Sequence, residues 1–97
     1  MEVRVQSVKF DADSKLIDFT TKKLMKLDRF FEGIIAAEVA MSLTPDHANK
    51  KVVVRLEIPG HDLHAETHAK TFEKAVRQSV DILKTQITKT KEKMRGV

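Results

Sequence analysis

Apolar residues recur at two different intervals along this chain, and the order of those intervals restricts the fold more than any other feature. In four short segments, apolar and polar residues alternate at every second position, which is typical of strands with one buried face. In two longer segments, apolar residues recur at every third or fourth position, which is typical of helices with one buried face. The strand-like segments are residues 2–8, 35–43, 51–58 and 62–67, and the helical segments are residues 15–31 and 70–94.

The order of these segments is β-α-β-β-β-α. Short turns at residues 44–49 and at Pro59-Gly60 join the last three strands, which are therefore expected to be antiparallel. The first helix is a crossover, which makes the first two strands parallel neighbours. Because each strand has one apolar face, both helices are expected on a single side of the sheet. The opposite side is expected to face solvent and to carry Arg4, Lys51, Arg55 and His64.

The predicted fold class is therefore α+β, with a four-stranded mixed sheet and two helices packed on one face, similar to double-stranded-RNA-binding domains. With 97 residues, the chain is expected to form one domain over residues 1–97, because a chain of this length can bury one hydrophobic core without disulfides or a bound metal. It contains no Cys, which excludes disulfides and thiolate metal sites and suits a reducing cytoplasm. The N-terminal residues do not form a signal peptide, and no apolar stretch is long enough to span a bilayer. A cytoplasmic location is expected.

The formal net charge of +4 is concentrated at one end of the chain. Residues 84–97 contain five basic residues and one acidic residue, whereas the other 83 residues contain thirteen of each. Asymmetry of this kind indicates a polyanionic partner, either nucleic acid or an anionic membrane.

The last predicted helix carries basic residues beside an apolar-to-neutral stripe. The stripe is expected to face the sheet and consists of Phe72, Ala75, Val76, Ser79, Ile82, Leu83, Gln86, Ile87, Thr90 and Met94. Beside it, Arg77, Lys84 and Lys91 recur at intervals of seven residues, and Arg95 follows. Because seven residues are nearly two helical turns, these four side chains are expected along one flank, over about 27 Å.

Two further groups of cations accompany this row. Lys89 and Lys93 form a shorter row on the other flank of the last helix, and Lys22, Lys26 and Arg29 lie on the first helix, opposite its apolar face. That apolar face consists of Leu16, Leu24, Leu27, Phe30 and Phe31. An ordinary solvated helix surface is the alternative interpretation, but the run from residue 84 onward has almost no acidic partner four residues away. We therefore expect these helices to bind phosphates of a polyanion.

Aromatic side chains contribute little to the predicted binding surface. The chain has no Tyr and no Trp, and at least three of its five Phe fall on the apolar faces of the helices. Recognition by base stacking is therefore poorly supported, and backbone recognition of RNA is expected.

Other classes of function have weaker support. His61, His64 and His68 are close together but match no metal-binding spacing. No phosphate-binding loop, nucleophile elbow or carboxylate pair on an apolar background is present, so neither an enzyme nor a cofactor is expected. A peripheral membrane helix is possible in principle, but the last helix lacks Trp or Phe for the bilayer interface and its apolar stripe is needed by the sheet.

Two segments of the chain are similar to those of a known family. They are Lys23-Leu24-Met25-Lys26-Leu27-x-x-Phe30-Phe31 in the first helix and Gln86-Ile87-Thr88-Lys89-Thr90-Lys91-Glu92-Lys93-Met94 at the end of the last one. Together with the order of the elements, they resemble the ribosome hibernation-promoting factors of the ribosome-associated inhibitor (sigma-54 modulation protein) family. The likeness covers about residues 1–95, and the alternating lysines are its most specific part. The chain stops where longer members continue into a dimerisation domain, so it resembles the short form.

The resemblance implies a partner and a role. Members of the family bind the small ribosomal subunit, meaning 16S rRNA and neighbouring proteins, over the decoding region. There they block mRNA and tRNA, inhibit translation in stationary phase and often favour ribosome dimers. It implies no small-molecule substrate, no membrane partner and a monomer off the ribosome. A generic double-stranded-RNA-binding module is the alternative function.

The family's basic residues are carried over by position. Lys23 and Lys26 match the basic residues of its first helix, and Lys89, Lys91 and Lys93 match its closing lysine row. Lys84 and Arg77 come only from helical periodicity, and Arg77 departs from the family, in which an acidic residue commonly occupies that position.

Overall fold

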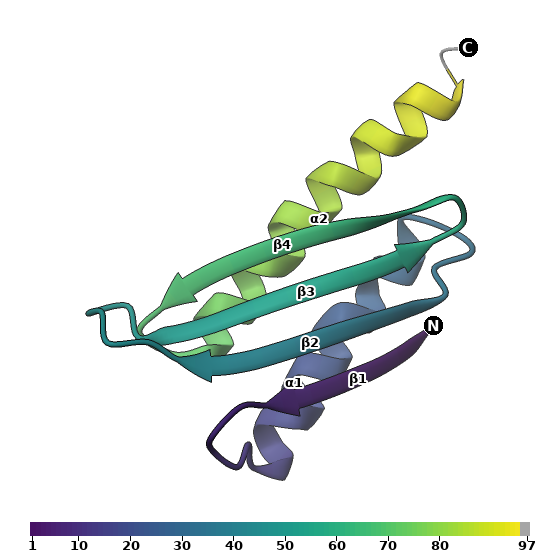
Figure 1. Ribbon diagram of the computed structural model, residues 1–97. Helices are drawn as coiled ribbons and strands as arrows, with labels where there is room; N and C mark the ends of the chain where they lie inside the picture. The colour runs from purple at the N-terminus through teal and green to yellow at the C-terminus, as the bar shows by residue number, and fades with distance from the viewer. Residues whose placement is uncertain (96–97) are drawn as a thin grey trace.

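The computed structural model describes residues 1–95, except for the side chains of Met94 and Arg95 (Figure 1). Its strands are β1 (Glu2–Ser7), β2 (Ala36–Leu43), β3 (Lys50–Ile58) and β4 (His61–Ala69). Its helices are α1 (Ser14–Met25), which continues as the 3-10 helix η1 (Lys26–Arg29), and α2 (Phe72–Arg95).

The four strands form one mixed sheet in the order β1-β2-β3-β4. β1 pairs with β2 in parallel, and β2, β3 and β4 pair in antiparallel fashion. In this register Val54 at the centre of β3 lies between Val39 of β2 and Ala65 of β4, and all three are buried. The predicted topology is confirmed.

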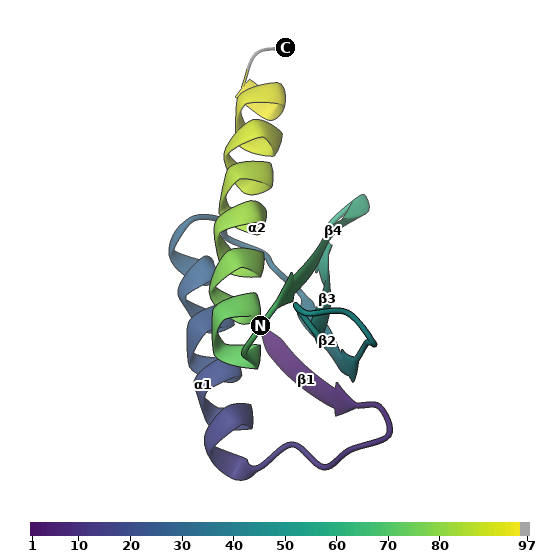
Figure 2. The ribbon, with the colours of Figure 1, turned by 90° about the vertical axis from the view of Figure 1, so that its left-hand side faces the viewer.

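Both helices cover the same face of the sheet, as predicted, and lie side by side (Figure 2). α1 packs mainly on β1, and α2 packs on β3 and β4. Leu24 and Leu27 from the first helical segment and Leu83 and Ile87 from α2 are fully buried between these layers. The other face of the sheet is uncovered, which explains why burial alternates along every strand.

Two buried hydroxyl groups tie α2 to the sheet. Thr67 of β4 donates to the carbonyl oxygen of Ala75 over 2.8 Å, and its oxygen lies 2.9 Å from the hydroxyl of Ser79. Thr67 and Ser79 are both buried, and these two interactions give each hydroxyl group the hydrogen-bond partner that a buried polar group requires. This explains why a neutral polar residue, Ser79, lies on the buried stripe of α2.

The first helix ends earlier than predicted. The sequence predicts one helix to Phe31, but the α-helix ends at Met25 and continues as a tighter 3-10 helix to Arg29. The N–H of Phe30 then bonds to the carbonyl of Leu27 over 2.9 Å, which satisfies a helix-end carbonyl by closing the turn more tightly. Gly33, with φ of 92°, reverses the chain in a conformation that favours glycine.

The boundaries of two later elements also differ. β4 runs from His61 to Ala69 rather than over residues 62–67, because its neighbour β3 begins at Lys50 and that residue pairs with Ala69. α2 begins at Phe72 rather than at residue 70, because the hydroxyl of Thr71 accepts the N–H of Lys74 over 3.1 Å and caps the helix.

Ile82 was predicted to face the sheet, and this prediction is wrong. Its side chain is 39% exposed. Ile82 lies on the flank of α2 that passes the outer edge of β4, where Gln86 donates from one turn later to the carbonyl of His64 over 2.7 Å. Since β4 is the edge strand, no further strand covers Ile82.

The C-terminal end of α2 projects beyond the sheet (Figure 1). Ile87 is the last residue of the helix whose side chain is described as buried. The lysines at 89, 91 and 93 therefore lie on the projecting part. Over residues 1–95, neither helix combines the length and the apolar character needed to cross a bilayer.

Candidate nucleic-acid interface

The helices carry all ten of the cations that the sequence analysis selected. Lys22, Lys23, Lys26 and Arg29 lie on α1 and η1, and Arg77, Lys84, Lys89, Lys91, Lys93 and Arg95 lie on α2. Lys23 and Lys91 are half-buried, and the other seven whose side chains are described are exposed. The side chain of Arg95 lies outside the described part of the structure.

One flank of α2 faces α1. The guanidinium carbon of Arg77 lies 5.2 Å from the centre of the Phe19 ring, and Nζ of Lys84 lies 4.6 Å from the centre of the Phe30 ring. Lys91 follows Lys84 by seven residues and continues this row. The predicted row therefore begins on the flank of α2 that faces α1, where Arg77 and Lys84 lie over the rings of Phe19 and Phe30. The two helices lie side by side along this part of α2 (Figure 2).

The other flank of α2 faces the edge of the sheet. Gln86 lies on this flank and bonds to β4. Lys89 and Lys93 follow Gln86 by three and seven residues, so they share its side of the helix, and both are exposed. α2 thus presents two separate rows of cations, as the sequence analysis predicted.

Phe19 and Phe30 position several of these cations, and the sequence analysis missed this role. In addition to Arg77, the ring of Phe19 has Nζ of Lys23 at 5.5 Å from its centre. Cation–π contacts of this kind are worth about 0.5–1 kcal/mol at exposed sites. The four-residue spacing from Phe19 to Lys23 could have indicated one contact, but the contact from Arg77 depends on how the helices pack.

The cations near Phe19 affect one another. The pKa of Lys23 is lowered by repulsion from Lys26, by partial desolvation and by repulsion from Arg77. Within the part of the chain whose side chains are described, no carboxylate forms an ion pair with any of the selected cations. Their positive charge is therefore available to an external anion.

Cations on the uncovered face of the sheet are paired instead. Arg4 lies 3.2 Å from Glu38, and Arg55 lies 2.7 Å from Glu38 and 3.1 Å from Asp62. The hydrogen bond to Glu38, with its negative charge, raises the pKa of Arg55. On the same face, Lys51 of β3 lies 3.8 Å from a carboxylate of β4. This face therefore has little free positive charge, although it contains the cations predicted there.

The helices and the rest of the chain also differ in their numbers of basic and acidic residues. α1, η1 and α2 contain twelve basic and five acidic residues, whereas the rest of the chain contains six basic and nine acidic residues. The positive charge of the molecule therefore belongs to its helical layer. A phosphate-rich partner is expected to approach this layer rather than the sheet.

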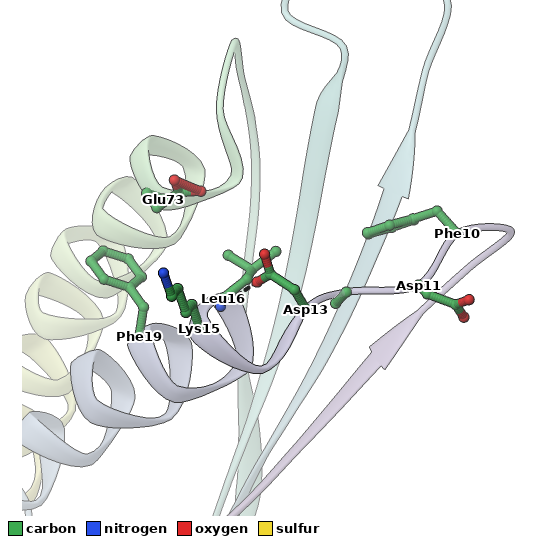
Figure 3. A pocket seen from close by; sticks show the side chains of 8 residues that line it. Phe10, Asp11, Asp13, Lys15, Leu16, Phe19 and Glu73 are labelled. Atoms are coloured by element: carbon green, nitrogen blue, oxygen red, sulfur yellow. Dashed lines mark hydrogen bonds between the residues drawn. The ribbon is translucent and has the colours of Figure 1, made fainter.

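A hollow of about 490 Å³ lies near the beginnings of α1 and α2 (Figure 3). Its lining combines apolar side chains with three carboxylates and one ammonium group. The lining residues are Phe10, Asp11, Ala12, Asp13, Lys15, Leu16, Phe19 and Glu73. Asp13 also caps α1 by accepting the N–H of Leu16 over 2.8 Å. The acidic lining makes this hollow unsuitable for phosphate, which agrees with placing the interface along the cation rows.

Comparison with known sequences gives a consistent match. The family described as "Sigma 54 modulation protein / S30EA ribosomal protein" matches residues 3–95. A ribosome hibernation promoting factor of Azotobacter vinelandii is 27% identical over 93 residues, which cover 96% of this chain and 85% of that protein. Another from Klebsiella oxytoca is 25% identical over 95 residues, which cover 98% of each chain. A ribosome hibernation promotion factor of Deinococcus radiodurans is 30% identical over 77 residues, 76% of this chain and 40% of that longer protein.

Two solved structures share the fold. The crystal structure of the Thermus thermophilus Protein Y N-terminal domain superposes with a TM-score of 0.83 at 24% identity, covering 93% of this chain and 99% of that one. The ribosomal subunit interface protein from Coxiella burnetii gives a TM-score of 0.84 at 22% identity, covering 94% and 98%. Both confirm the predicted fold class.

Proposed function

Because this chain belongs to the sigma 54 modulation protein / S30EA ribosomal protein family, we propose that it is a ribosome hibernation factor that binds the small ribosomal subunit over the decoding region. Bound there, it blocks mRNA and tRNA, inhibits translation in stationary phase and promotes or stabilises ribosome dimers. Residues 1–97 act as one binding domain in this proposal, and 16S rRNA with its neighbouring proteins is the partner.

The observation that carries this proposal is the set of cations on the helical layer that have no carboxylate partner among the described side chains. RNA presents phosphates at regular intervals, and each one that a protein cation neutralises releases condensed counterions. Packing on the sheet orients α2, and the two Phe rings orient Arg77 and Lys84, before binding, so less side-chain freedom is lost on association. The proposed contacts are Lys22, Lys23, Lys26, Arg29, Arg77, Lys84, Lys89, Lys91, Lys93 and Arg95.

The proposed mechanism is exclusion by volume. The structure measures 44 × 24 × 18 Å along its principal axes. In a channel that admits a single RNA strand, a folded body of this size leaves no room for mRNA or for the anticodon end of a tRNA. No chemical step is required, so the inhibition is expected to be reversible when the protein dissociates.

The proposed contacts predict how binding depends on salt. If four to six phosphates are neutralised, log affinity should fall with log salt with a slope of about 3–5. A slope near zero would contradict phosphate recognition, because the released counterions are the source of that dependence.

The direct test reverses the closing lysines. We expect K89E/K91E/K93E to abolish co-sedimentation with purified small subunits, because three attractive contacts become repulsive ones. The matched control is K9E/K51E/K70E, which makes the same change of net charge outside the proposed interface. Unchanged co-sedimentation of the first variant, with circular dichroism showing an intact fold, would refute the proposed interface.

A generic duplex-RNA module is the second candidate, because the interface offers cations but few groups that read bases. Titration with naked duplex RNA and with purified small subunits at the same salt concentration separates the two functions. The proposed factor should bind subunits more tightly than duplex RNA. Equal affinity for both would favour the generic module.

A further inference from the structure

β4 is an outer strand of the sheet, and its free edge is long (Figure 1). It spans nine residues and pairs with β3 in an unbroken register, so no bulge interrupts it. It contains neither proline nor lysine, which commonly prevent edge strands from pairing, whereas the other edge strand, β1, has only six residues. Within residues 1–95, no strand pairs with the outer side of β4. Such an edge is a template for a further strand.

Alternate residues of β4 direct their backbone groups away from β3. The carbonyl of Glu57 in β3 accepts the N–H of Ile35 over 2.9 Å, so Glu57 faces β2. Asp62, which lies opposite Glu57, therefore faces outward, and so does His64 two residues later. The carbonyl of His64 accepts a hydrogen bond from Nε2 of Gln86 over 2.7 Å. Because a carbonyl oxygen can accept two hydrogen bonds, His64 can also pair with a further strand.

We propose that the free edge of β4 pairs with β4 of a second copy of this chain, in antiparallel fashion, and joins the two sheets into one. This pairing goes beyond the proposed function, because it concerns the protein away from the ribosome, where the family resemblance implies a monomer. Its basis is the free edge, the side chains of β4 and the exposed Ile82.

The outward-facing residues of β4 alternate between carboxylates and imidazoles. Their order is Asp62, His64, Glu66 and His68, and their side chains lie on the uncovered face of the sheet. When two copies run antiparallel about a two-fold axis at Ala65, His64 lies opposite the partner's Glu66, and Asp62 lies opposite the partner's His68. Each imidazole then has a carboxylate acceptor, and each pair occurs twice.

The side chains favour this register over its neighbours. A shift of two residues in either direction places carboxylate opposite carboxylate or imidazole opposite imidazole, which is unfavourable. Glu66 already contacts His68 over 3.3 Å and Lys51 over 3.8 Å, and Asp62 contacts Arg55 over 3.1 Å. Since a carboxylate has about four acceptor positions, both can accept a further bond.

An exposed apolar side chain lies at the same axis. α2 contacts Thr67 one turn before Ile82 and His64 one turn after it, so Ile82 lies level with Ala65. Ile82 is 39% exposed, on the flank of α2 that passes the outer edge of β4. In the dimer the two Ile82 side chains approach each other across the axis and are removed from water. The position of Ile82 and the order of side chains in β4 therefore indicate one axis independently.

The test measures the mean mass of the protein by sedimentation equilibrium over a series of concentrations. We expect the mass to rise from 11.0 kDa toward twice that value as concentration increases. A mass that remains at 11.0 kDa up to about 1 mM would overturn the proposal. The assay contains no ribosomes, so its result does not depend on whether the proposed function is correct.

A matched pair of variants tests the surface. I82K places two ammonium groups at the axis and should weaken dimerisation by about tenfold. I17K makes the same change at a side chain that is 38% exposed on α1, which packs on β1 at the opposite edge of the sheet, and should leave dimerisation unchanged. Equal weakening by both variants would mean that net charge is responsible, and the proposal would fail.

A second pair tests the register. H64E places a carboxylate opposite the partner's Glu66 at two symmetric sites and should weaken dimerisation by about tenfold. The exchange H64E/E66H keeps the composition of the parent protein and again places an imidazole opposite each carboxylate, so it should restore dimerisation. If the exchange dimerises no better than H64E, the two β4 strands do not pair in this way. Circular dichroism checks that each variant is folded.

Discussion

Lys84 and Thr85 are neighbours on α2 but point in directions about 100° apart, because an α-helix has 3.6 residues per turn. Nζ of Lys84 lies 4.6 Å from the centre of the Phe30 ring, on the flank of α2 that faces the first helical segment, and Thr85 is exposed. The double variant K84T/T85K keeps the composition and net charge of the protein but moves one cation out of the row. If the position of each cation matters, this exchange should weaken binding to the small subunit.

The expected loss follows from the number of phosphate contacts removed, which is one. Each neutralised phosphate contributes about 0.9 to the slope of log affinity against log salt, which at about 0.15 M salt corresponds to about fivefold in affinity. K84T/T85K should therefore bind about fivefold more weakly and lower the salt slope by about 0.9. Loss of the contact with Phe30 should also lower the free energy of unfolding by about 0.5–1 kcal/mol, which is small enough to leave the protein folded.

The assay is a titration of labelled protein with purified small subunits over a series of salt concentrations. K84T should lose as much affinity as the double variant, and T85K should lose none, since it keeps Lys84 and adds a cation. Circular dichroism confirms that each variant is folded at the assay temperature. If K84T/T85K binds as tightly as the parent protein, total charge governs binding, and the idea of a directed row of cations is wrong.

Three further predictions concern stability. T67V removes the hydroxyl that bonds to α2 and leaves the buried Ser79 hydroxyl without that partner, so it should lower the free energy of unfolding by about 1–3 kcal/mol in urea; an unchanged urea midpoint would contradict the buried pairing. D13A removes the side chain that caps α1 and should lower the free energy of unfolding by about 1 kcal/mol, whereas D13N should lower it only slightly; equal losses in the two variants would show that the capping hydrogen bond is not the cause. Repulsion from Lys26 lowers the pKa of Lys23 in the folded state, so the unfolded chain binds this proton more tightly, and the contribution of Lys23 to stability should rise between that lowered pKa and its ordinary value of 10.5. K23Q should remove this rise, measured as the change in Tm between about pH 7 and about pH 10, and an identical change in both proteins would refute the assignment.

The sequence predicts the order, type and pairing of the elements because these depend on local properties of the chain. The alternation in β3, from Val52 to Ile58, marks its buried face without reference to any other segment. The spacing of Leu83 and Ile87 does the same for α2. The ends of the helices were less predictable. η1 and the start of α2 at Phe72 depend on individual turns and caps, which compete within a few residues of each other.

The candidate interface shows the same limit. Periodicity predicts that Arg77, Lys84 and Lys91 share a flank of α2, but it does not say what that flank faces. Contacts with Phe19 and Phe30 show that the flank faces α1. The exposure of Ile82 was missed for a related reason, since whether a residue at the margin of a stripe is covered depends on where the sheet ends.

Two periodic patterns, their order and a surplus of basic residues toward the C-terminal end can all be read from the chain, because each is a property of residues close together in it. Which cations are neutralised depends instead on how distant segments pack. Arg4 forms an ion pair with Glu38, 34 residues away, because β1 and β2 pair in parallel. Arg77 instead repels Lys23, because α1 and α2 lie side by side. Ion pairs and cation–π contacts act over a few ångströms, so this packing determines where free positive charge remains.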